Sequence, residues 1–190
     1  LLLLYRILAR KEQWKEKILL TSTGNVAVDN LVNRIIEVQE KLVQDPEHRF
    51  TLRRYGKKLS PTNRTNVEHL HIETLCTNNE YQIDPQRYEE EVSNADVLAG
   101  TLSSLPNCAV SKRVFDVCIA DENGQTMEIE NLIALNRVRQ RMTLIGDQNQ
   151  LGQQCRCELL KWTNFPRSLM ERLAPRDSYV LPINYRSHQS

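Results

Sequence analysis

Two adjacent acids follow an apolar run in the segment VFDVCIADENGQ, which covers residues 114–125. The run is typical of a buried strand, and Asp121 and Glu122 would stand at its carboxyl end. Because one Asp or Asn is enough to close a turn, two carboxylates at this point indicate either a metal site or an acid–base site. The alternative is a solvated turn that carries two acids by chance.

Three other segments place polar residues where strands are expected to end. IGDQNQLG at 145–152 contains Gln150, whose side-chain amide is suited to bind a γ-phosphate or its attacking water. INYRSH at 183–188 contains Arg186, the residue type that stabilises charge on a phosphoryl group during transfer. In TSTGNVAVDN at 21–30, Thr23 and Asn25 would offer hydroxyl, amide and helix-start N–H groups to an anion.

The elements that must position these residues alternate along the chain. The apolar patterns predict helices at about 1–14, 26–43, 67–75, 85–92, from 125 onward and at 168–174, and strands at 17–22, 49–54, 95–101, 114–120, 142–147 and 179–185. Short apolar strands with intervening helices predict an α/β fold, a doubly wound parallel sheet. Ligands bind such sheets at the carboxyl ends of the strands, where Asp121 and Glu122 are expected.

Five motifs, in order, resemble those of the superfamily 1 helicases of the nonsense-mediated-decay type, whose relatives include senataxin and Armitage. They are STGNVAVD at 22–29 for motif Ia, DENGQ at 121–125 for motif II, GDQNQLGQ at 146–153 for motif III, SLMERL at 168–173, and YRSH at 185–188 for motif IV. The resemblance implies a RecA-like P-loop NTPase fold. It also implies part of an ATP-dependent helicase or translocase that moves on single-stranded RNA or DNA.

The same resemblance implies roles in ATP hydrolysis. Asp121 would hold Mg²⁺, and Glu122 would be the catalytic base that acts on the attacking water. Gln150 would couple the phosphate to the strand-binding surface, and Arg186 would be the arginine finger. Asp121, Gln125 and Asp147 would bind the nucleotide.

Nucleic acid would be contacted through its backbone by Thr23, Asn25 and Thr101, although capping and turn formation explain Asn25 and Thr101 nearly as well. A basic cluster formed by Arg53, Arg54, Lys57 and Lys58 could add phosphate contacts, and a solvated basic face is the alternative.

The sequence departs from the family pattern in three places. Thr23-Gly24 replaces the Pro-Ser of motif Ia, and Gln153 replaces the last Pro of motif III. A P-loop requires GxxxxGK followed by Ser or Thr, and Gly56, the one Gly that precedes a Lys, is followed by Lys58 at the second position. We therefore expect the P-loop to lie upstream of Leu1.

The expected organisation is a RecA-like motor domain at 1–180, without its P-loop and with an insertion at about 57–93. Residues 181–190 would hold motif IV and the start of the link to an absent second RecA-like domain of the same full-length chain. A catalytically inactive, helicase-like module that binds nucleic acid or protein is the alternative function. Another P-loop NTPase, such as an AAA-type ATPase, is a weaker third interpretation.

Composition limits the remaining classes. The net charge of the 190 residues is +1, so any nucleic-acid site must be local. The five Cys contain no CxxC pair, which argues against a zinc ribbon or a disulfide framework and indicates reduced thiols. The opening LLLL is too short to span a membrane and lacks the features of a signal peptide. We expect a cytoplasmic or nuclear protein with no membrane partner.

Overall fold

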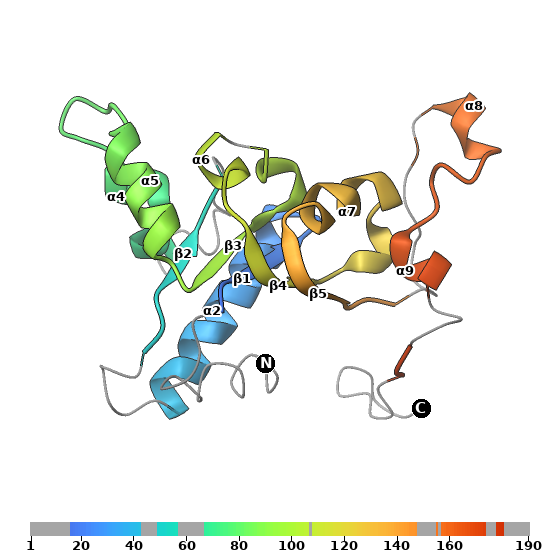
Figure 1. Cartoon of the computed structure of the whole chain (residues 1–190), viewed down its shortest axis with the longest axis horizontal. Helices are drawn as coiled ribbons and strands as arrows, with labels where there is room; N and C mark the ends of the chain where they lie inside the picture. Colours follow the sequence, from blue (N-terminus) through green and yellow to red (C-terminus); the bar gives the residue numbers. More distant parts are fainter. Residues whose placement is uncertain are drawn as a thin grey trace.

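The computed structural model describes residues 16–42, 49–56, 67–106, 108–147, 155, 157–173 and 178–180. Five parallel strands form one sheet in the order β2-β3-β1-β4-β5 (Figure 1). The strands are β1 (Ile18–Ser22), β2 (Leu52–Arg54), β3 (Val97–Thr101), β4 (Phe115–Ala120) and β5 (Val138–Leu144). The prediction of a parallel α/β sheet is confirmed.

Helices and 3-10 turns connect the strands. They are α2 (Asn25–Leu42), η2 (Glu68–Leu70), α4 (Ile72–Cys76), α5 (Pro85–Asn94), η3 (Leu102–Ser104), α6 (Cys108–Ser111), η4 (Asn123–Gln125), α7 (Glu128–Leu135), α8 (Glu158–Lys161) and α9 (Leu169–Leu173). No helix in these described segments is long and apolar enough to cross a membrane.

Local sequence explains where the two clearest helices form. In α2, Val28, Val32 and Ile35 repeat at helical spacing and are all buried against the sheet. In α5, the Asp84 carboxylate accepts hydrogen bonds from the backbone N–H groups of Gln86 and Arg87, at 2.9 and 3.2 Å, and Pro85 occupies the first turn. These signals are local, which is why both helices could be predicted.

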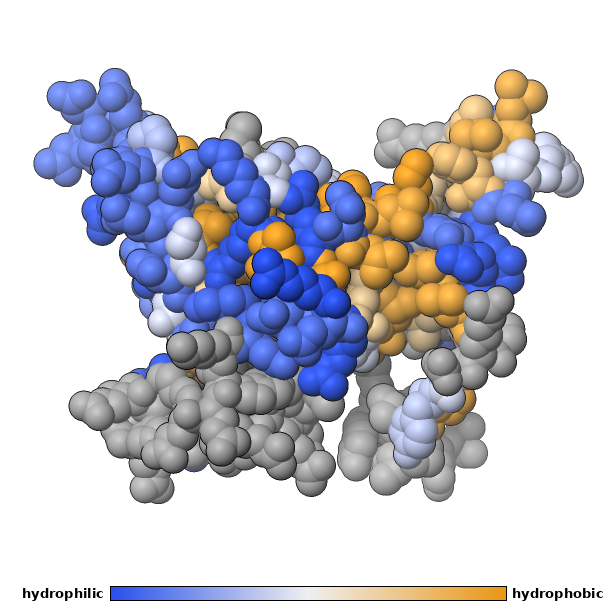
Figure 2. Space-filling model, viewed as in Figure 1, coloured by the Kyte–Doolittle hydropathy of each residue, from blue (hydrophilic) through white to orange (hydrophobic). Residues whose placement is uncertain are grey.

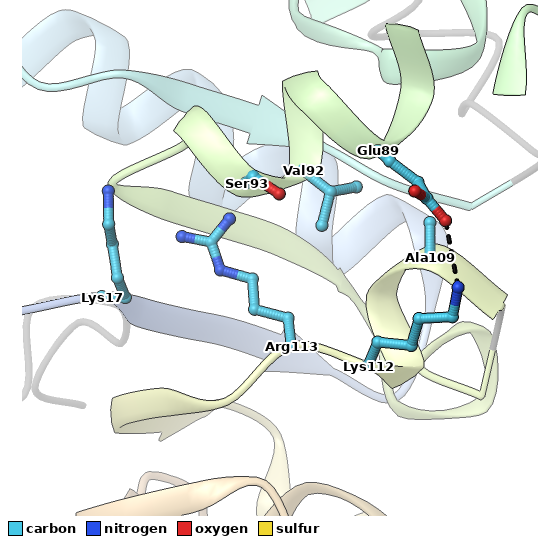
Figure 3. A pocket seen from close by; sticks show the side chains of 7 residues that line it. All are labelled: Lys17, Glu89, Val92, Ser93, Ala109, Lys112 and Arg113. Carbon is cyan, nitrogen blue, oxygen red and sulfur yellow. Dashed lines mark hydrogen bonds and ion pairs between the residues drawn. The ribbon is translucent and has the colours of Figure 1, made fainter. Parts of the chain in front are cut away.

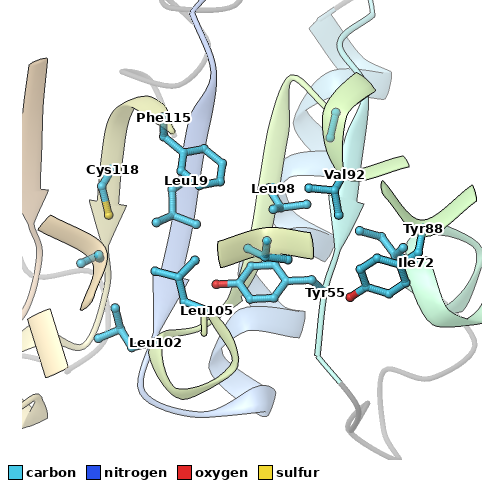
Figure 4. Packing of buried hydrophobic residues seen from close by; sticks show 14 of the residues in the cluster. Leu19, Tyr55, Ile72, Tyr88, Val92, Leu98, Leu102, Leu105, Phe115 and Cys118 are labelled. Carbon is cyan, nitrogen blue, oxygen red and sulfur yellow. The ribbon is translucent and has the colours of Figure 1, made fainter. Parts of the chain in front are cut away.

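Helices cover both faces of the sheet, as a doubly wound fold requires (Figure 1). Successive strand residues point to opposite faces, so Ile18 and Leu20 pack in the core on the α2 side while Leu19 packs in the other core. The second core also contains side chains from α4, α5, α6 and α7. Figure 4 shows its centre, with Tyr55 beside Leu98 and Leu105.

Gly100 of β3 makes room for the buried Tyr55. A Cβ atom added at Gly100 would lie 2.3 Å from two ring carbons of Tyr55, closer than real contacts allow. The Tyr55 hydroxyl donates a hydrogen bond to the Thr101 carbonyl at 3.2 Å. Burial raises the pKa of Tyr55, so the phenol stays protonated at any working pH. Glycine at position 100 thus leaves room for the Tyr55 ring to pack against β3.

Residues 67–94 contribute to this core, since Ile72, Cys76, Tyr88 and Val92 are all buried in it. The two short helical regions expected near 67–75 and 85–92 are confirmed as η2, α4 and α5. Whether 57–93 is an insertion relative to the family remains a prediction.

Three predicted boundaries are wrong or only partly covered. β5 spans Val138–Leu144 rather than 142–147, and its polar start is tolerated because Arg139, Gln140 and Arg141 are exposed. The helix expected from 125 begins at Glu128, where the Met127 N–H donates to the Glu130 carboxylate at 3.0 Å. Residues 178–180 form no strand, while the rest of 179–185 and the helix expected at 1–14 lie outside the described residues.

Candidate functional site

The carboxyl ends of three adjacent strands meet at one edge of the sheet. Ser22 of β1 is in register with Thr101 of β3, and Thr21 of β1 is in register with Ala120 of β4. The Asp121 N–H extends this pairing by donating to the Thr21 carbonyl at 2.8 Å. The segments that follow β1, β3 and β4 are therefore neighbours, as predicted from the parallel topology.

Asp121 and Glu122 leave β4 at this edge, and both side chains are half-buried. Glu122 has φ 55° and ψ 32°, a left-handed conformation that non-glycine residues seldom adopt. Strained residues of this kind are maintained where the surrounding structure fixes them, and they concentrate at functional sites. The backbone strain beside Asp121 therefore favours a functional role for this acid pair.

Buried asparagines hold the turn after Glu122. Asn123 is fully buried, and its side-chain N–H donates to the side-chain oxygen Oδ1 of Asn131 in α7 at 2.8 Å. Its backbone N–H donates to the Ile145 carbonyl at 2.8 Å, immediately after β5. The turn is thereby fixed to both α7 and the end of β5, which leaves Glu122 little freedom to relax.

The turns that follow β4 and β5 touch through two glycines. A Cβ atom at Gly146 would lie 2.7 Å from the Gly124 nitrogen, and one at Gly124 would lie 2.5 Å from the Asp147 carbonyl oxygen. Asp147 itself is exposed. Motifs II and III, which are separated in the sequence, form one continuous surface because both glycines lack a side chain. Sequence reasoning had not identified the role of these glycines.

Asn25, the first residue of α2, belongs to a buried polar network. Arg54 of β2 donates from Nη2 to Asn25 Oδ1 at 2.8 Å and from Nε to Asp29 Oδ1 at 2.8 Å. The side chains of Arg54 and Asp29 are both 0% exposed. The Arg54 guanidinium also donates to the Tyr55 carbonyl.

This network corrects the basic cluster. Arg54 is neither a surface phosphate contact nor part of a solvated face, because it is buried against Asp29. Arg53 points to the opposite side of the strand and pairs with Glu91 of α5 at 2.5 Å. Lys57 and Lys58 lie outside the described residues. Alternation along β2 separates two arginines that appear as a cluster in the sequence.

The other two residues predicted to contact nucleic acid, Thr23 and Thr101, differ in exposure. Thr23 is exposed, whereas Thr101 is only 4% exposed and its hydroxyl bonds to Ser104 Oγ at 2.7 Å and Ser103 Oγ at 3.1 Å. Thr101 therefore helps to form the turn, which was the alternative explanation for this residue. Ser103, which is exposed, is the member of this hydroxyl cluster at the surface.

Gln125 is exposed beside the acid pair, and Gln150 and Arg186 lie outside the described residues. Among the described residues, the structure therefore brings together Asp121, Glu122 and Asp147. The roles predicted for Gln150 and Arg186 remain predictions.

The donor atoms at this edge suit a hard divalent cation bound together with a ligand. Asp121 and Glu122 supply carboxylate oxygens, and the hydroxyls of Thr21 and Ser22 on β1 are buried without a hydrogen-bond partner in the described part of the chain. Within the same segments no three His, Cys, Asp or Glu side chains form a metal cage. Carboxylates with few other protein ligands are typical of Mg²⁺ sites completed by water and phosphate oxygens.

A hollow of about 330 Å³ lies at the opposite end of the sheet from the acid pair (Figure 3). It is lined in part by Lys17, just before β1, and by Lys112 and Arg113, just before β4. Lys112 pairs with Glu89, and Lys17 pairs with Asp96, each at 3.1 Å. Arg113 donates to the Ala95 carbonyl at 2.5 Å. These contacts hold α5 and α6 against the sheet and so give the hollow a structural role.

Exposed apolar side chains gather at the α7 end of the molecule (Figure 2). Ile129, Leu132 and Leu135 of α7 are 53%, 48% and 45% exposed. They follow one another at three-residue spacing, so they share one side of the helix.

Comparison with known proteins agrees with this geometry. A family described as an AAA domain matches residues 51–153. Regulator of nonsense transcripts 1 of Caenorhabditis elegans is 27% identical over 188 residues, which cover 90% of this chain and 18% of the relative. The Dictyostelium discoideum protein of the same name is 27% identical, over 92% of this chain and 15% of the relative. Helicase sen1 of Schizosaccharomyces pombe is 29% identical, over 64% of this chain and 8% of its own length. The chain thus spans less than a fifth of the length of each of these relatives.

Proposed function

This chain belongs to the AAA domain family, and on that premise we propose that it forms most of the first motor domain of an ATP-dependent helicase or translocase. The relatives described above include proteins named as regulators of nonsense transcripts and as a helicase, which favours this activity over that of another AAA-type ATPase. The substrate would be single-stranded RNA or DNA. The protein would act in the cytoplasm or the nucleus.

In this proposal the edge formed by the β4 and β5 turns binds the phosphates of ATP. Asp121 would hold Mg²⁺, which when bound would neutralise charge on the phosphate oxygens. Glu122 would accept a proton from the attacking water, and its fixed backbone would keep the carboxylate in one place. Gln125 and Asp147 would complete the nucleotide contacts on this side, with Gln150 and Arg186 in the roles that their motifs imply.

Single-stranded nucleic acid would bind beside this edge, at the start of α2. Thr23 and Asn25 are at the surface there, and Thr101 would act through the hydroxyl cluster that reaches Ser103. Hydroxyl and amide donors contact phosphate and sugar rather than base edges, so binding would tolerate many sequences. A second RecA-like domain of the full-length chain would close over the ATP and couple hydrolysis to movement.

The observation that carries this proposal is the strained Glu122 directly after Asp121, at the edge where two glycine turns meet. The test is the Glu122→Gln substitution in the full-length protein. A catalytic base contributes a factor of about 10² to 10⁴, so strand-stimulated ATP turnover should fall at least about a hundredfold while ATP still binds.

Glu80→Gln provides the matched control, because Glu80 is exposed in the turn between α4 and α5, away from the site. Its turnover should equal that of the unmodified protein. Unchanged turnover in Glu122→Gln would overturn the assignment of the base. Strand binding by an unmodified protein that hydrolyses no ATP would instead support the catalytically inactive binding module.

A further inference from the structure

Arg54, which forms a buried ion pair with Asp29, makes more hydrogen bonds than are needed to neutralise its charge. Removing two charges from water is costly, and an ion pair in the interior often stabilises a fold no better than apolar residues would. Arg54 nevertheless divides its donors among three acceptors: the Asp29 carboxylate, the Tyr55 carbonyl and the side chain of Asn25. The third contact reaches out of the core to the first residue of α2.

That contact determines which way the Asn25 amide faces. A guanidinium group has donors and no acceptor, so the Asn25 atom 2.8 Å from Arg54 Nη2 must be the carbonyl oxygen Oδ1. The NH₂ group then points away from Arg54. Asn25 is half-buried, and within the described segments its side chain makes one hydrogen bond, the one that Oδ1 accepts from Arg54. Two N–H donors are therefore available at this position.

The surroundings of that NH₂ group favour an anion. The first backbone N–H groups of an α-helix lack partners within the helix, and the helix dipole is positive at this end. α2 is 18 residues long and has no acidic residue in its first turn. If the Asn25 amide were reversed, its oxygen would face the same space and repel a phosphate.

We propose that Arg54 is a positioning residue, which holds Asn25 so that its NH₂ group donates to a phosphate oxygen of the bound single strand. This inference rests on the proposed function, because it takes the start of α2 as part of the strand-binding surface. Arg54 itself touches no ligand. Asp29 holds the Arg54 guanidinium in place, and Arg54 in turn fixes the orientation of Asn25 at the surface.

The first experiment reverses the chemistry at the surface while keeping the buried contact. Asn25→Asp in the full-length protein retains an oxygen for Arg54 but replaces the outward NH₂ group with a second oxygen. Affinity for a fluorescent oligouridine, measured by anisotropy, should fall by about tenfold or more, because one hydrogen bond to a charged group is replaced by a repulsion. The thermal midpoint should not fall.

Asn30→Asp is the matched control, since it adds the same charge on the exposed side of the same helix. Its affinity should stay within about twofold of the unmodified protein, as expected for a charge screened by solvent and salt. Equal losses in the two variants would reduce the effect to general repulsion and overturn the proposal. Wild-type affinity in Asn25→Asp would overturn it too.

A double-mutant cycle then tests whether Arg54 acts through Asn25. Arg54→Lys keeps the charge opposite Asp29 but lacks the planar fork, so the amide is released. The substitution should weaken strand binding in the unmodified background and have no further effect in an Asn25→Ala background. A merely structural role would give the same loss in both backgrounds and overturn the inference. If Arg54→Lys lowers the thermal midpoint severely, the proposal is tested by the comparison of Asn25→Asp with Asn30→Asp alone.

Strand binding by the unmodified protein shows whether a failure lies in the proposed function or only in the role of Arg54. Failure of the unmodified protein to bind oligouridine or oligothymidine would overturn the proposed strand site itself. Strand binding that is indifferent to position 25 would leave the motor intact and overturn only the role of Arg54.

Discussion

Glu122 occupies a backbone conformation that suits glycine better than any other residue. A left-handed conformation costs a non-glycine residue on the order of 1–3 kcal/mol, and here it places a carboxylate beside Asp121. The same conformation occurs at Tyr81, with φ 60°, in the exposed turn before α5. Among the residues that the structure describes, two non-glycine residues have a positive φ, one at the candidate site and one remote from it.

Replacing Glu122 by glycine should separate stability from activity. Glu122→Gly relieves the strain, so the free energy of unfolding should rise by about 1 kcal/mol while ATP turnover of the full-length protein is lost. Tyr81→Gly should give a similar gain in stability with normal turnover. Urea unfolding and ATPase assays on both variants provide the measurement. A loss of stability in Glu122→Gly would show that its side chain has a structural role.

At the scale of elements, the decisive contact is the one between the β4 and β5 turns. Two strand ends can share a ligand only if the turns that follow them lie within one ligand diameter. Gly124 and Gly146 allow this approach. Backbone atoms of each turn occupy the space that a side chain on the glycine of the other turn would need.

A single methyl group should therefore force the turns apart. Gly146→Ala places a Cβ atom 2.7 Å from the Gly124 nitrogen and 3.0 Å from the Asn123 nitrogen, which the rigid backbone cannot easily yield. We expect a loss of about 1–3 kcal/mol in the free energy of unfolding. Turnover should also fall, because Asp121 and Glu122 move with the turn.

Gly24→Ala is the control for this substitution, since a Cβ atom at Gly24 meets nothing within 4 Å. Any loss should come from helix capping alone and be about 1 kcal/mol or less, because Gly is a better residue than Ala at the start of a helix. Equal stability of Gly146→Ala and the unmodified protein would mean that the two turns are free to move.

The elements show clearly what sequence could and could not predict. β1, β3 and β4 were found because their apolar runs are continuous, as fully buried parallel strands require. The burial of Arg54 could not be read from its neighbours, because its partner Asp29 lies 25 residues away on another element. The strain at Glu122 was equally hidden, since Ile145 and Asn131, which fix that turn, lie just after β5 and within α7.

At the scale of the whole molecule, a buried histidine links the fold to pH. His71 is 3% exposed, and its Nε2 bonds to the Gly56 carbonyl between β2 and α4. Burial lowers the pKa of His71 below its ordinary value of 6.5, with the nearby Arg54 charge acting in the same direction. The folded protein therefore holds the imidazole neutral at a pH where the unfolded chain begins to bind a proton.

This difference predicts a sign for acid stability. Below pH 6.5 the unfolded state gains a proton at His71 that the folded state does not, so the free energy of unfolding should fall with falling pH. The slope from this residue approaches about 1.4 kcal/mol per pH unit and ends at the lowered folded pKa.

Urea unfolding between pH 7.5 and about 5 measures this slope. His71→Gln keeps a hydrogen-bond donor and should flatten the pH dependence, whereas His69→Gln, at an exposed position two residues earlier, should leave it unchanged. Equal slopes in all three proteins would place the acid sensitivity elsewhere.

The sheet order also bears on how the protein is made. β1 is the first described strand to leave the ribosome and lies at the centre of the sheet, yet it pairs with β3 and β4 and not with β2, the strand that follows it. The contacts that Lys17, just before β1, makes with Asp96 and Asp116 span 79 and 99 residues of chain. At about 5–20 residues per second, synthesis leaves the apolar Ile18–Leu20 segment without its neighbours for several seconds. During that interval the nascent chain presents an unpaired, aggregation-prone strand until β3 and β4 have been translated.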